Sequence, residues 1–381
     1  MGQEPRNVLL LGGGKIGRMI AELLHTTGDY ALTVADRDHE ALQRLARAVP
    51  GVDTRQIDVA DERALHDAVR GFDIVVSALS YYHNPAVARA ALAAGASYFD
   101  LTEDVRTTRE VRAIAERARG GQVFMPQCGL APGFVSVLAH DLTRNFDQVD
   151  SIHMRVGALP QFPSNHLKYN LTWSTDGLIN EYCNPCEAIV AGEPREVLPL
   201  EGLEHFSLDG VRYEAFNTSG GLGTMCETLH GKVRELNYKT IRYLGHRELA
   251  SFLVHGLRLS ERREQLKDIL EYAIPITFQD VVIVFCVASG FRRGQLVQVS
   301  DARKIYSHPI RGENWSAIQI TTAAGICTMI DLFSQGQLGR SGFVRQEEVP
   351  LALFLDNRFG RHYESKVASR FAFSEAEQVT P

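Results

Sequence analysis

The amino-acid sequence predicts an α/β protein in which a doubly wound parallel sheet is followed by a second domain of the α+β class. Over the first 127 residues, short apolar runs alternate with segments of helical periodicity, and a glycine-rich turn joins the first run to the first helix. Beyond residue 128, several strand-like segments alternate apolar with polar residues, as half-buried antiparallel strands do. The length of 381 residues exceeds what one hydrophobic core usually supports, so two domains are expected.

The amino-terminal elements follow one another in a regular strand and helix alternation. Residues 7–11 (NVLLL) form an apolar run, and residues 16–24 repeat apolar side chains at helical spacing. The same alternation predicts strands at 31–35, 54–59, 73–79, 97–101 and 122–126, and helices at 38–48, 61–70, 85–95 and 107–119. Short buried strands separated by helices form a parallel sheet covered on both faces. We therefore place a Rossmann dinucleotide-binding domain at residues 1–127.

The remaining elements predict an α+β domain with a mainly antiparallel sheet at residues 128–311, which is the candidate substrate and dimerisation domain. Its strands are expected at 149–157, 211–216, 281–289 and 294–300, and its helices at 247–258 and 261–273. Small and apolar residues nearly encircle the helix expected at 315–334, which indicates burial. We expect residues 312–363 to rejoin the first domain, and residues 364–381 to form a polar tail.

Composition excludes several classes of function. Hydrophobic residues make up 45% and charged residues 23% of the chain, which is ordinary for a globular protein. The formal net charge of −6 offers no basic footprint for nucleic acid. No apolar run is long enough to cross a bilayer, and the charged start lacks the apolar stretch of a signal peptide. Six scattered cysteines indicate reduced thiols. The sequence thus predicts a cytoplasmic protein with no membrane and no nucleic-acid partner.

A metal site is also not expected. Cys183 and Cys186 form a CxxC, but no second pair stands at zinc spacing, and Asn184-Pro185 between them favours a turn.

The first glycine-rich turn has the pattern of a pyrophosphate site. Gly12, Gly14 and Gly17, with Lys15 and Ile16 between the last two, fit G-x-G-x-x-G at the junction of a strand and a helix. In this setting the first glycine permits the turn, the second lets a pyrophosphate approach the backbone, and the third allows helix and strand to pack closely. Glycine-rich turns also occur without a ligand, so the motif needs a second feature.

Asp36 supplies that feature. It ends the second expected strand, where an acidic side chain holds the ribose hydroxyls of NAD and repels the 2′-phosphate of NADP. Arg37 follows at once and could accommodate a phosphate if Asp36 turned away. Asp58, placed at the end of the third strand, is a candidate neighbour of the adenine, or else a cap of the following helix. The cofactor predicted from these residues is NAD.

Four further segments resemble the saccharopine dehydrogenase family. They are SYYHNP at 80–85, YFDLTE at 98–103, CGLAPG at 128–133 and KTIRYLGH at 239–246, and the resemblance extends from the glycine turn to about Tyr363. Within the family the chain looks most like the NAD-dependent lysine 6-dehydrogenases, because of its length, Asp36 and the ending RFGRHY at 358–363. Fungal saccharopine reductases prefer NADP and lack an acid at that point.

This resemblance implies an oxidoreductase that acts on an amine. A lysine 6-dehydrogenase passes hydride from the carbon bearing the terminal amine to NAD, and water then hydrolyses the imine to a semialdehyde that cyclises. Alternatives are a saccharopine or carboxynorspermidine dehydrogenase, which acts on a secondary amine, and a dinucleotide-binding sensor or partner-binding protein without catalysis. The expected partner is a small amine or amino acid, and family members form homodimers or homotetramers.

Candidate catalytic residues follow the fourth, fifth and sixth expected strands. Asp100 and Glu103 stand at the carboxyl edge of the sheet and are candidates for amine contact or for the base, although Glu103 and Asp104 could simply begin the next helix. In the family, the tyrosine equivalent to Tyr81 lies beside the nicotinamide with Cys128 nearby. Ser80 is assigned to the cofactor, Tyr82 is a neighbouring possibility for Tyr81, and Cys128 could instead be an apolar filler.

Candidate substrate residues lie in the second domain. Arg242 matches the arginine that binds the substrate carboxylate in the family, and a planar guanidinium suits that contact. His246 lies near it in sequence, whereas Lys239 fits a solvated strand edge better. Trp173 and Ser174 resemble residues of the substrate cleft, with core packing as the alternative for Trp173. Thr218 lies in a turn, TSGG, whose hydroxyls could reach a ligand.

Overall fold

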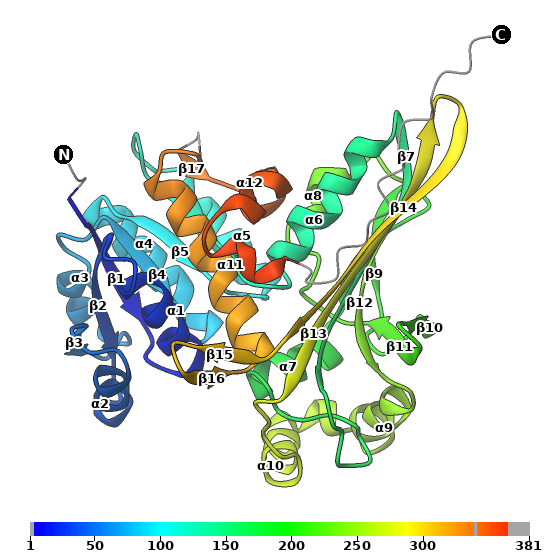
Figure 1. Cartoon of the computed structure of the whole chain (residues 1–381), viewed down its shortest axis with the longest axis horizontal. Coiled ribbons are helices and arrows are strands. Elements are labelled where there is room, and N and C mark those ends of the chain that lie inside the picture. The colour runs from blue at the N-terminus through cyan, green and yellow to red at the C-terminus, as the bar shows by residue number, and fades with distance from the viewer. Residues whose placement is uncertain (1–3, 339–340, 365–381) are drawn as a thin grey trace.

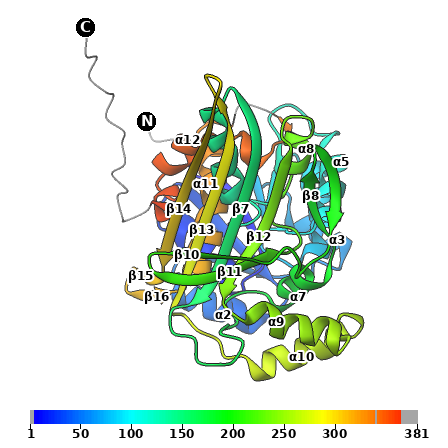
Figure 2. The ribbon, with the colours of Figure 1, turned by 90° about the vertical axis from the view of Figure 1, so that its right-hand side faces the viewer.

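The computed structural model describes residues 4–338 and 341–364. Two sheets stand side by side, and helix α11 (Ala317–Ser334) lies between them (Figure 1). The sheet formed early in the chain carries helices on its faces, as the sequence predicts. The later sheet is long and strongly twisted, and its strands β14, β13, β7 and β12 run side by side in Figure 2.

The first sheet is a seven-stranded parallel sheet in the order β17-β6-β5-β4-β1-β2-β3. The strands are β1 Arg6–Leu11, β2 Tyr30–Asp36, β3 Asp53–Gln56, β4 Ile74–Ser77, β5 Ser97–Asp100, β6 Val123–Met125 and β17 Gly342–Phe343. The helices between them are α1 Lys15–His25, α2 His39–Ala48, α3 Glu62–Ala68, α4 Asn84–Ala94 and α5 Val105–Ala115. The predicted doubly wound fold is confirmed, and the strand order reverses between β1 and β4, where such folds bind ligands.

The second sheet has eight strands and is mixed. Its main path runs β10-β11-β12-β7-β13-β14, and β8 pairs with β12 and with β9. The strands are β7 Gln148–Pro160, β8 Cys186–Val190, β9 Glu193–Val197, β10 Glu204–Leu208, β11 Val211–Asn217, β12 Glu235–Tyr243, β13 Asp280–Arg292 and β14 Gln295–Tyr306. Its pairs are antiparallel except that of β12 with β7, which is parallel.

Short helices and one small ribbon complete the second half of the chain. The helices are α6 Phe134–Leu142, α7 Thr175–Cys183, α8 Met225–Leu229, α9 His246–Ser251, α10 Arg263–Ala273 and α12 Leu351–Asp356, with a π-helical turn at Phe252–Gly256. The ribbon pairs β15 (His308–Ile310) with β16 (Glu313–Trp315). Helix α6 lies against β13 and β7 on the side of the large sheet that faces the first domain (Figure 1).

One expectation about this sheet is wrong. Lys239 was expected at a solvated strand edge, but β12 lies inside the sheet between β11 and β7. Its ammonium group donates to the carbonyl of Gly202 at 2.6 Å and pairs with Glu204 at 2.8 Å. The strand looked like an edge because three basic residues crowd its sequence, whereas in the fold a carboxylate from β10 neutralises one of them.

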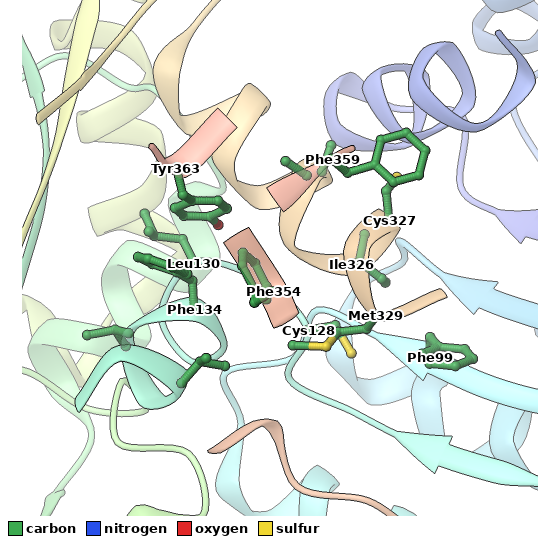
Figure 3. Packing of buried hydrophobic residues seen from close by; sticks show 14 of the residues in the cluster. Phe99, Cys128, Leu130, Phe134, Ile326, Cys327, Met329, Phe354, Phe359 and Tyr363 are labelled. Carbon is green, nitrogen blue, oxygen red and sulfur yellow. The ribbon is translucent and has the colours of Figure 1, made fainter. Parts of the chain in front are cut away.

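Helix α11 is the central core element. It is long and apolar enough to cross a membrane by composition, but 83% of it is buried inside the protein, as expected for the core helix of a folded domain. It packs against α1 and β5 of the first sheet and against β13 of the second. Figure 3 shows the packing beside it, where Phe134 stacks on Tyr363 and Phe354 packs against both rings at an angle. The carboxyl-terminal segment therefore returns to the first domain through α11 and β17.

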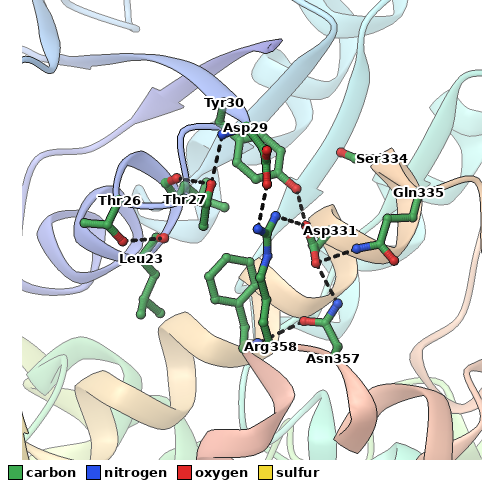
Figure 4. A network of polar contacts seen from close by, with 12 residues as sticks. Leu23, Thr26, Thr27, Asp29, Tyr30, Asp331, Ser334, Gln335, Asn357 and Arg358 are labelled. Carbon is green, nitrogen blue, oxygen red and sulfur yellow. Dashed lines mark hydrogen bonds and ion pairs between the residues drawn. The ribbon is translucent and has the colours of Figure 1, made fainter. Parts of the chain in front are cut away.

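A buried polar network ties α11 to the start of β2. Asp331 is 1% exposed and accepts hydrogen bonds from Tyr30, Gln335, Asn357 and Arg358, at 2.6 to 2.9 Å (Figure 4). The four donors satisfy a carboxylate that would otherwise be costly to bury.

Candidate active site

The glycine turn after β1 has the geometry of a dinucleotide cradle. Gly12 adopts φ of +104°, and a Cβ there would meet the carbonyl oxygen of Ala78 at 2.7 Å. A Cβ on Gly17 would stand 1.8 Å from the carbonyl oxygen of Gly12, so only glycine lets α1 approach β1 this closely. The described part of the chain places no heavy atom within 4 Å of a Cβ position on Gly14, which leaves the amino end of α1 open to a ligand. The turn therefore fits a pyrophosphate.

Asp36 is held at the end of β2 by the turn itself. Its Oδ2 accepts from the backbone N–H of Gly13 at 2.7 Å, and its Oδ1 accepts from the N–H of Asp38 at 2.9 Å. The carboxylate is thus fixed beside the glycine turn, and each oxygen keeps a second lone pair for a ribose hydroxyl.

Other residues assigned to the cofactor lie around this turn with exposed side chains. Lys15 begins α1, Arg37 follows β2, and Asp58 lies beyond the end of β3, in a turn where it accepts from the N–H of Ala60. Asp58 does not cap α3, because Asp61 does so through two backbone N–H groups. Burial lowers the pKa of nearby His83, and the charges of Asp58 and Arg37 act on it in opposite directions.

A cavity of about 570 Å³ opens where the two domains face each other across α11. Such a volume lies within the roughly 300–1,000 Å³ typical of ligand sites. The first domain lines it with residues that follow β4, β5 and β6, and the second domain lines it from β7, α7, β12 and α10. Ile16 of the glycine turn and Ser80 after β4 line it too, so the cavity is continuous with the cofactor cradle.

The candidate residues Tyr81, Glu103, Trp173, Ser174 and Arg242 all line this cavity. The ring of Tyr81 contacts that of Tyr82, which also lines the cavity and is 65% exposed. Trp173 donates from its indole to the hydroxyl of Tyr169 at 3.1 Å, and Ser174 caps α7 by accepting from the N–H of Gly177. The structure thus brings together five residues from both domains that are far apart in sequence.

Asp100 is not among the lining residues. It is fully buried, and its carboxylate accepts from the N–H of Thr102, the N–H of Gln127 and the hydroxyl of Tyr98. Burial raises the pKa of this carboxyl to about 6, against the lowering effect of those hydrogen bonds. Its observed role is to hold the loops after β5 and β6 together beneath the cavity.

Cys128 is also enclosed. Its side chain is 1% exposed, and its Sγ lies 2.9 Å from the carbonyl oxygen of Met125 and 3.0 Å from Nε2 of Gln346 (Figure 3 shows its surroundings). Burial raises the pKa of the thiol, so it stays protonated. Cys128 is therefore a member of a buried contact network under the cavity.

Glu103 and Asp104 follow β5 with different roles. Asp104 caps α5 by accepting from the N–H of Thr107 at 2.7 Å, so it lies at the start of this helix, which was the alternative given for it. Glu103 lines the cavity, and burial raises its pKa, while the Asn180 side chain lowers it. The turn at Gly220 lies against it, because a Cβ there would be 2.7 Å from the carbonyl oxygen of Glu103.

Arg242 is fixed by a chain of neutral groups. Its Nε donates to the hydroxyl of Tyr182 at 3.0 Å, and this hydroxyl lies 2.8 Å from Nε2 of His246, whose Nδ1 lies 2.8 Å from the carbonyl oxygen of Leu167. The carbonyl can only accept, so Nδ1 donates and Nε2 accepts from Tyr182. His246 thus lies behind Arg242, away from the cavity, and acts on it through Tyr182.

Thr218 lies behind the cavity wall as well. It is 2% exposed, and its hydroxyl is 2.7 Å from that of Thr240, which does line the cavity.

Comparison with known proteins decides the family. The sequence matches the family models described as saccharopine dehydrogenase NADP binding domain, over residues 8–125, and saccharopine dehydrogenase C-terminal domain, over residues 129–353. This chain belongs to the saccharopine dehydrogenase family. The predicted resemblance and the predicted class, an oxidoreductase with a nicotinamide cofactor, are thereby confirmed.

Relatives of known name agree with this assignment. The chain is 27% identical to saccharopine dehydrogenase [NADP(+), L-glutamate-forming] of Saccharomyces cerevisiae, over 78% of its own length and 67% of that enzyme. It is 21% identical to the mitochondrial alpha-aminoadipic semialdehyde synthase of Mus musculus, over 95% of its own length but 38% of that protein. A solved apo structure of the histidine-tagged yeast saccharopine dehydrogenase superposes with a TM-score of 0.73 at 18% identity, and the match covers 90% of this chain and 94% of that one.

Sequence reasoning missed several cavity residues of this saccharopine dehydrogenase family member. Helix α7 supplies Asp176, Asn180 and Glu181, and α10 supplies Arg263 and Lys267. Helix α10 was predicted at 261–273, but not its position at the cavity, and for α7 the only signal was Ser174 ahead of an acidic residue, which is a helix start. Helix α7 has no clear apolar periodicity, so the sequence predicted neither the helix nor the side to which its acidic side chains point.

The cavity of this family member has charge of both signs at its wall. Lys267 pairs with Asp176 at 2.8 Å, and Arg263 donates to the side chains of Asn180 and Asn184. Among residues 4–338 and 341–364, no group of three potential ligands could hold a metal ion. The arrangement suits a small zwitterion next to a dinucleotide.

Proposed function

We propose that the protein catalyses the NAD-dependent oxidative deamination of a terminal amine, with L-lysine as the leading substrate. Bound NAD would supply the hydride acceptor. The overall conversion is that of lysine, NAD and water to the semialdehyde, ammonium, NADH and one proton, after which the semialdehyde cyclises.

The charge of the cavity carries this proposal. Its wall contains four acidic and three basic side chains, namely Glu103, Asp176, Glu181 and Glu264 against Arg242, Arg263 and Lys267. Lysine with both amines protonated has one net positive charge, whereas saccharopine, with three carboxylates and two ammonium groups, has one net negative charge. Burial raises the pKa of Glu103 and of Glu181; once both are ionised, the wall has an excess of negative charge, which favours the cation and disfavours the anion.

The position of Glu103 supports an amine oxidation. A terminal ammonium must lose its proton before its nitrogen can assist hydride loss, because its pKa is near 10.4. Glu103 follows the carboxyl end of β5 and lines the cavity, and burial raises its pKa. A carboxylate with a raised pKa is suited to take that proton.

The anchoring of Asp36 supports NAD as the cofactor. Two backbone N–H groups hold its carboxylate beside the glycine turn, so Asp36 does not need to turn away for the turn to form. A 2′-phosphate would meet this negative charge. The names of the family model and of the yeast relative contain NADP, which makes the preference a point for direct test.

The second candidate is a saccharopine dehydrogenase, and the names of the relatives favour it. The experiment is to mix purified protein with NAD or NADP and to follow absorbance of the reduced cofactor with L-lysine alone and with saccharopine alone. Lysine with NAD alone should give NADH. Reduction only with saccharopine would overturn the lysine proposal, and faster reduction of NADP than of NAD would overturn the cofactor preference.

We further propose the organisation that the sequence predicted: a cofactor domain at 1–127 rejoined by 312–363, a second domain at 128–311, a homodimer or homotetramer, and a cytoplasmic location. The packing of α11 and β17 against the first sheet supports the rejoining. The tail at 365–381 lies outside the described residues.

A further inference from the structure

One carboxylate oxygen of Glu181 receives no hydrogen bond from the described part of the chain. It lies on α7 and lines the cavity, and its Oε2 is buried without a hydrogen-bond partner. Its side chain is 13% exposed, and the remaining contacts that act on its charge are electrostatic. A buried carboxylate oxygen without a donor is rare, so a donor from a ligand is the natural partner.

The neighbour of Glu181 is Arg242, whose Nη2 lies 3.6 Å from the same Oε2. This distance gives charge attraction without a hydrogen bond. The guanidinium uses Nε for Tyr182 and Nη1 for the carbonyl of Ile241, which leaves N–H groups on Nη1 and Nη2 for a ligand. A fixed cation with free donors and a fixed anion with free acceptors therefore stand next to each other.

An α-amino acid presents the matching pair. Its α-carboxylate and α-ammonium sit on one carbon, about as close together as Arg242 and Glu181 are. The guanidinium binds a carboxylate well, and a carboxylate binds an ammonium through charge-assisted hydrogen bonds. Glu103 comes from the other domain and also lines the cavity, and its charge adds to the raised pKa of Glu181, so the two acids can contact different groups of one substrate.

We propose that Glu181 binds the α-ammonium of the substrate while Arg242 binds its α-carboxylate, so that this pair selects an α-amino acid over a simple amine. The inference rests on the proposed function, since it takes the substrate to be an amino acid with a terminal amine. Glu103 then receives the terminal ammonium at the far end.

The test removes the carboxylate of Glu181 from the protein and the α-ammonium from the substrate, one at a time. L-lysine is compared with 6-aminohexanoate, which lacks only the α-amine, in the wild type and in Glu181→Gln. The control is Glu187→Gln, which removes a carboxylate six positions along the chain that pairs with Arg109. Calorimetry with each amine gives dissociation constants, and initial rates give kcat and KM.

In the wild type, 6-aminohexanoate should bind about 10- to 100-fold more weakly than lysine, the value of a charge-assisted hydrogen bond. Glu181→Gln should weaken the binding of lysine by a similar factor and leave the binding of 6-aminohexanoate nearly unchanged, so that the preference for lysine is lost. Glu187→Gln should keep it. Glu181→Asp, which retains the charge beside Arg242, should keep part of the preference and serves if the glutamine variant does not fold.

Equal weakening of both amines by Glu181→Gln would overturn the proposal, because it would show that Glu181 only supports Arg242. A wild type that binds both amines equally would overturn it too. If lysine binds but neither cofactor is reduced, the proposed oxidation fails while the binding comparison still decides the role of Glu181.

Discussion

Replacement of Asp36 by alanine should change the cofactor preference, and its size follows from the geometry. In the wild type the carboxylate is held by the N–H groups of Gly13 and Asp38 and is free to accept from the ribose. Loss of a charged hydrogen bond costs about 1.5–3 kcal/mol, so NAD should bind roughly 10- to 150-fold more weakly. This loss of NAD affinity depends on the contact of Asp36 with the ribose and not on the residues that bind the amine.

NADP should respond in the opposite direction. A phosphate charge about 5 Å from a carboxylate is repelled by about 3 kcal/mol at an effective dielectric constant of 20, and salt reduces this at a half-exposed position. The ratio of the dissociation constants of NADP and NAD should therefore fall by about 100-fold or more in Asp36→Ala.

The assay is calorimetric or fluorescence titration with each dinucleotide, without substrate. Asp61→Ala is the matched control, since Asp61 also accepts from two backbone N–H groups and carries the same charge, but caps α3. A ratio that stays constant in Asp36→Ala, or that changes equally in Asp61→Ala, would refute the argument that Asp36 selects the ribose.

Three further predictions concern buried polar groups. Tyr182→Phe removes the acceptor for Nε of Arg242, so urea unfolding should show a loss of about 2–4 kcal/mol and the KM for lysine should rise with a smaller change in kcat. Asp331→Ala leaves three neutral donors without their acceptor and leaves Arg358 with Asp29 as its remaining carboxylate partner, and should cost about 3 kcal/mol in the same measurement. Burial raises the pKa of Asp280 to about 6 from its ordinary 3.8, so its contribution is fully present below about pH 4 and is lost as the pH rises through 6. The free energy of unfolding of the wild type should fall by about 3 kcal/mol over that window relative to Asp280→Asn, and parallel curves would contradict it.

The Rossmann half of the fold could be predicted because each of its signals is local. An apolar run, a glycine turn and an amphipathic segment each lie within about ten residues, and the acidic residue that completes the site ends the next strand. The second sheet was predicted less completely. Strand β12 pairs in parallel with β7, which precedes it by about 80 residues, and no local pattern encodes such a pairing.

The candidate active site was also predicted only where the local sequence determines the position of a residue. Asp100 was placed correctly at the end of β5, but its carboxylate turns toward the N–H groups of Thr102 and Gln127 instead of the cavity. Which way a side chain points depends on unsatisfied donors in the neighbouring loop, and the sequence gives no sign of these. Glu181 escaped notice for the converse reason, because its helix is short and its partner lies 61 positions away on β12.

His246 and Glu181, which both lie near Arg242, affect the pH dependence of lysine binding differently. Burial and the nearby guanidinium lower the pKa of His246 to about 3, so the chain through Tyr182 keeps the same protons from acid to neutral pH and the orientation of Arg242 does not change. Burial raises the pKa of Glu181 to about 7, with Arg242 opposing the shift and Glu103 adding to it. A raised pKa means that Glu181 is protonated below about pH 7 and gains its charge above it. Lysine binding should therefore strengthen as the pH rises through 7. The change comes from the ionisation of Glu181, because the groups that orient the guanidinium of Arg242 do not titrate in this range.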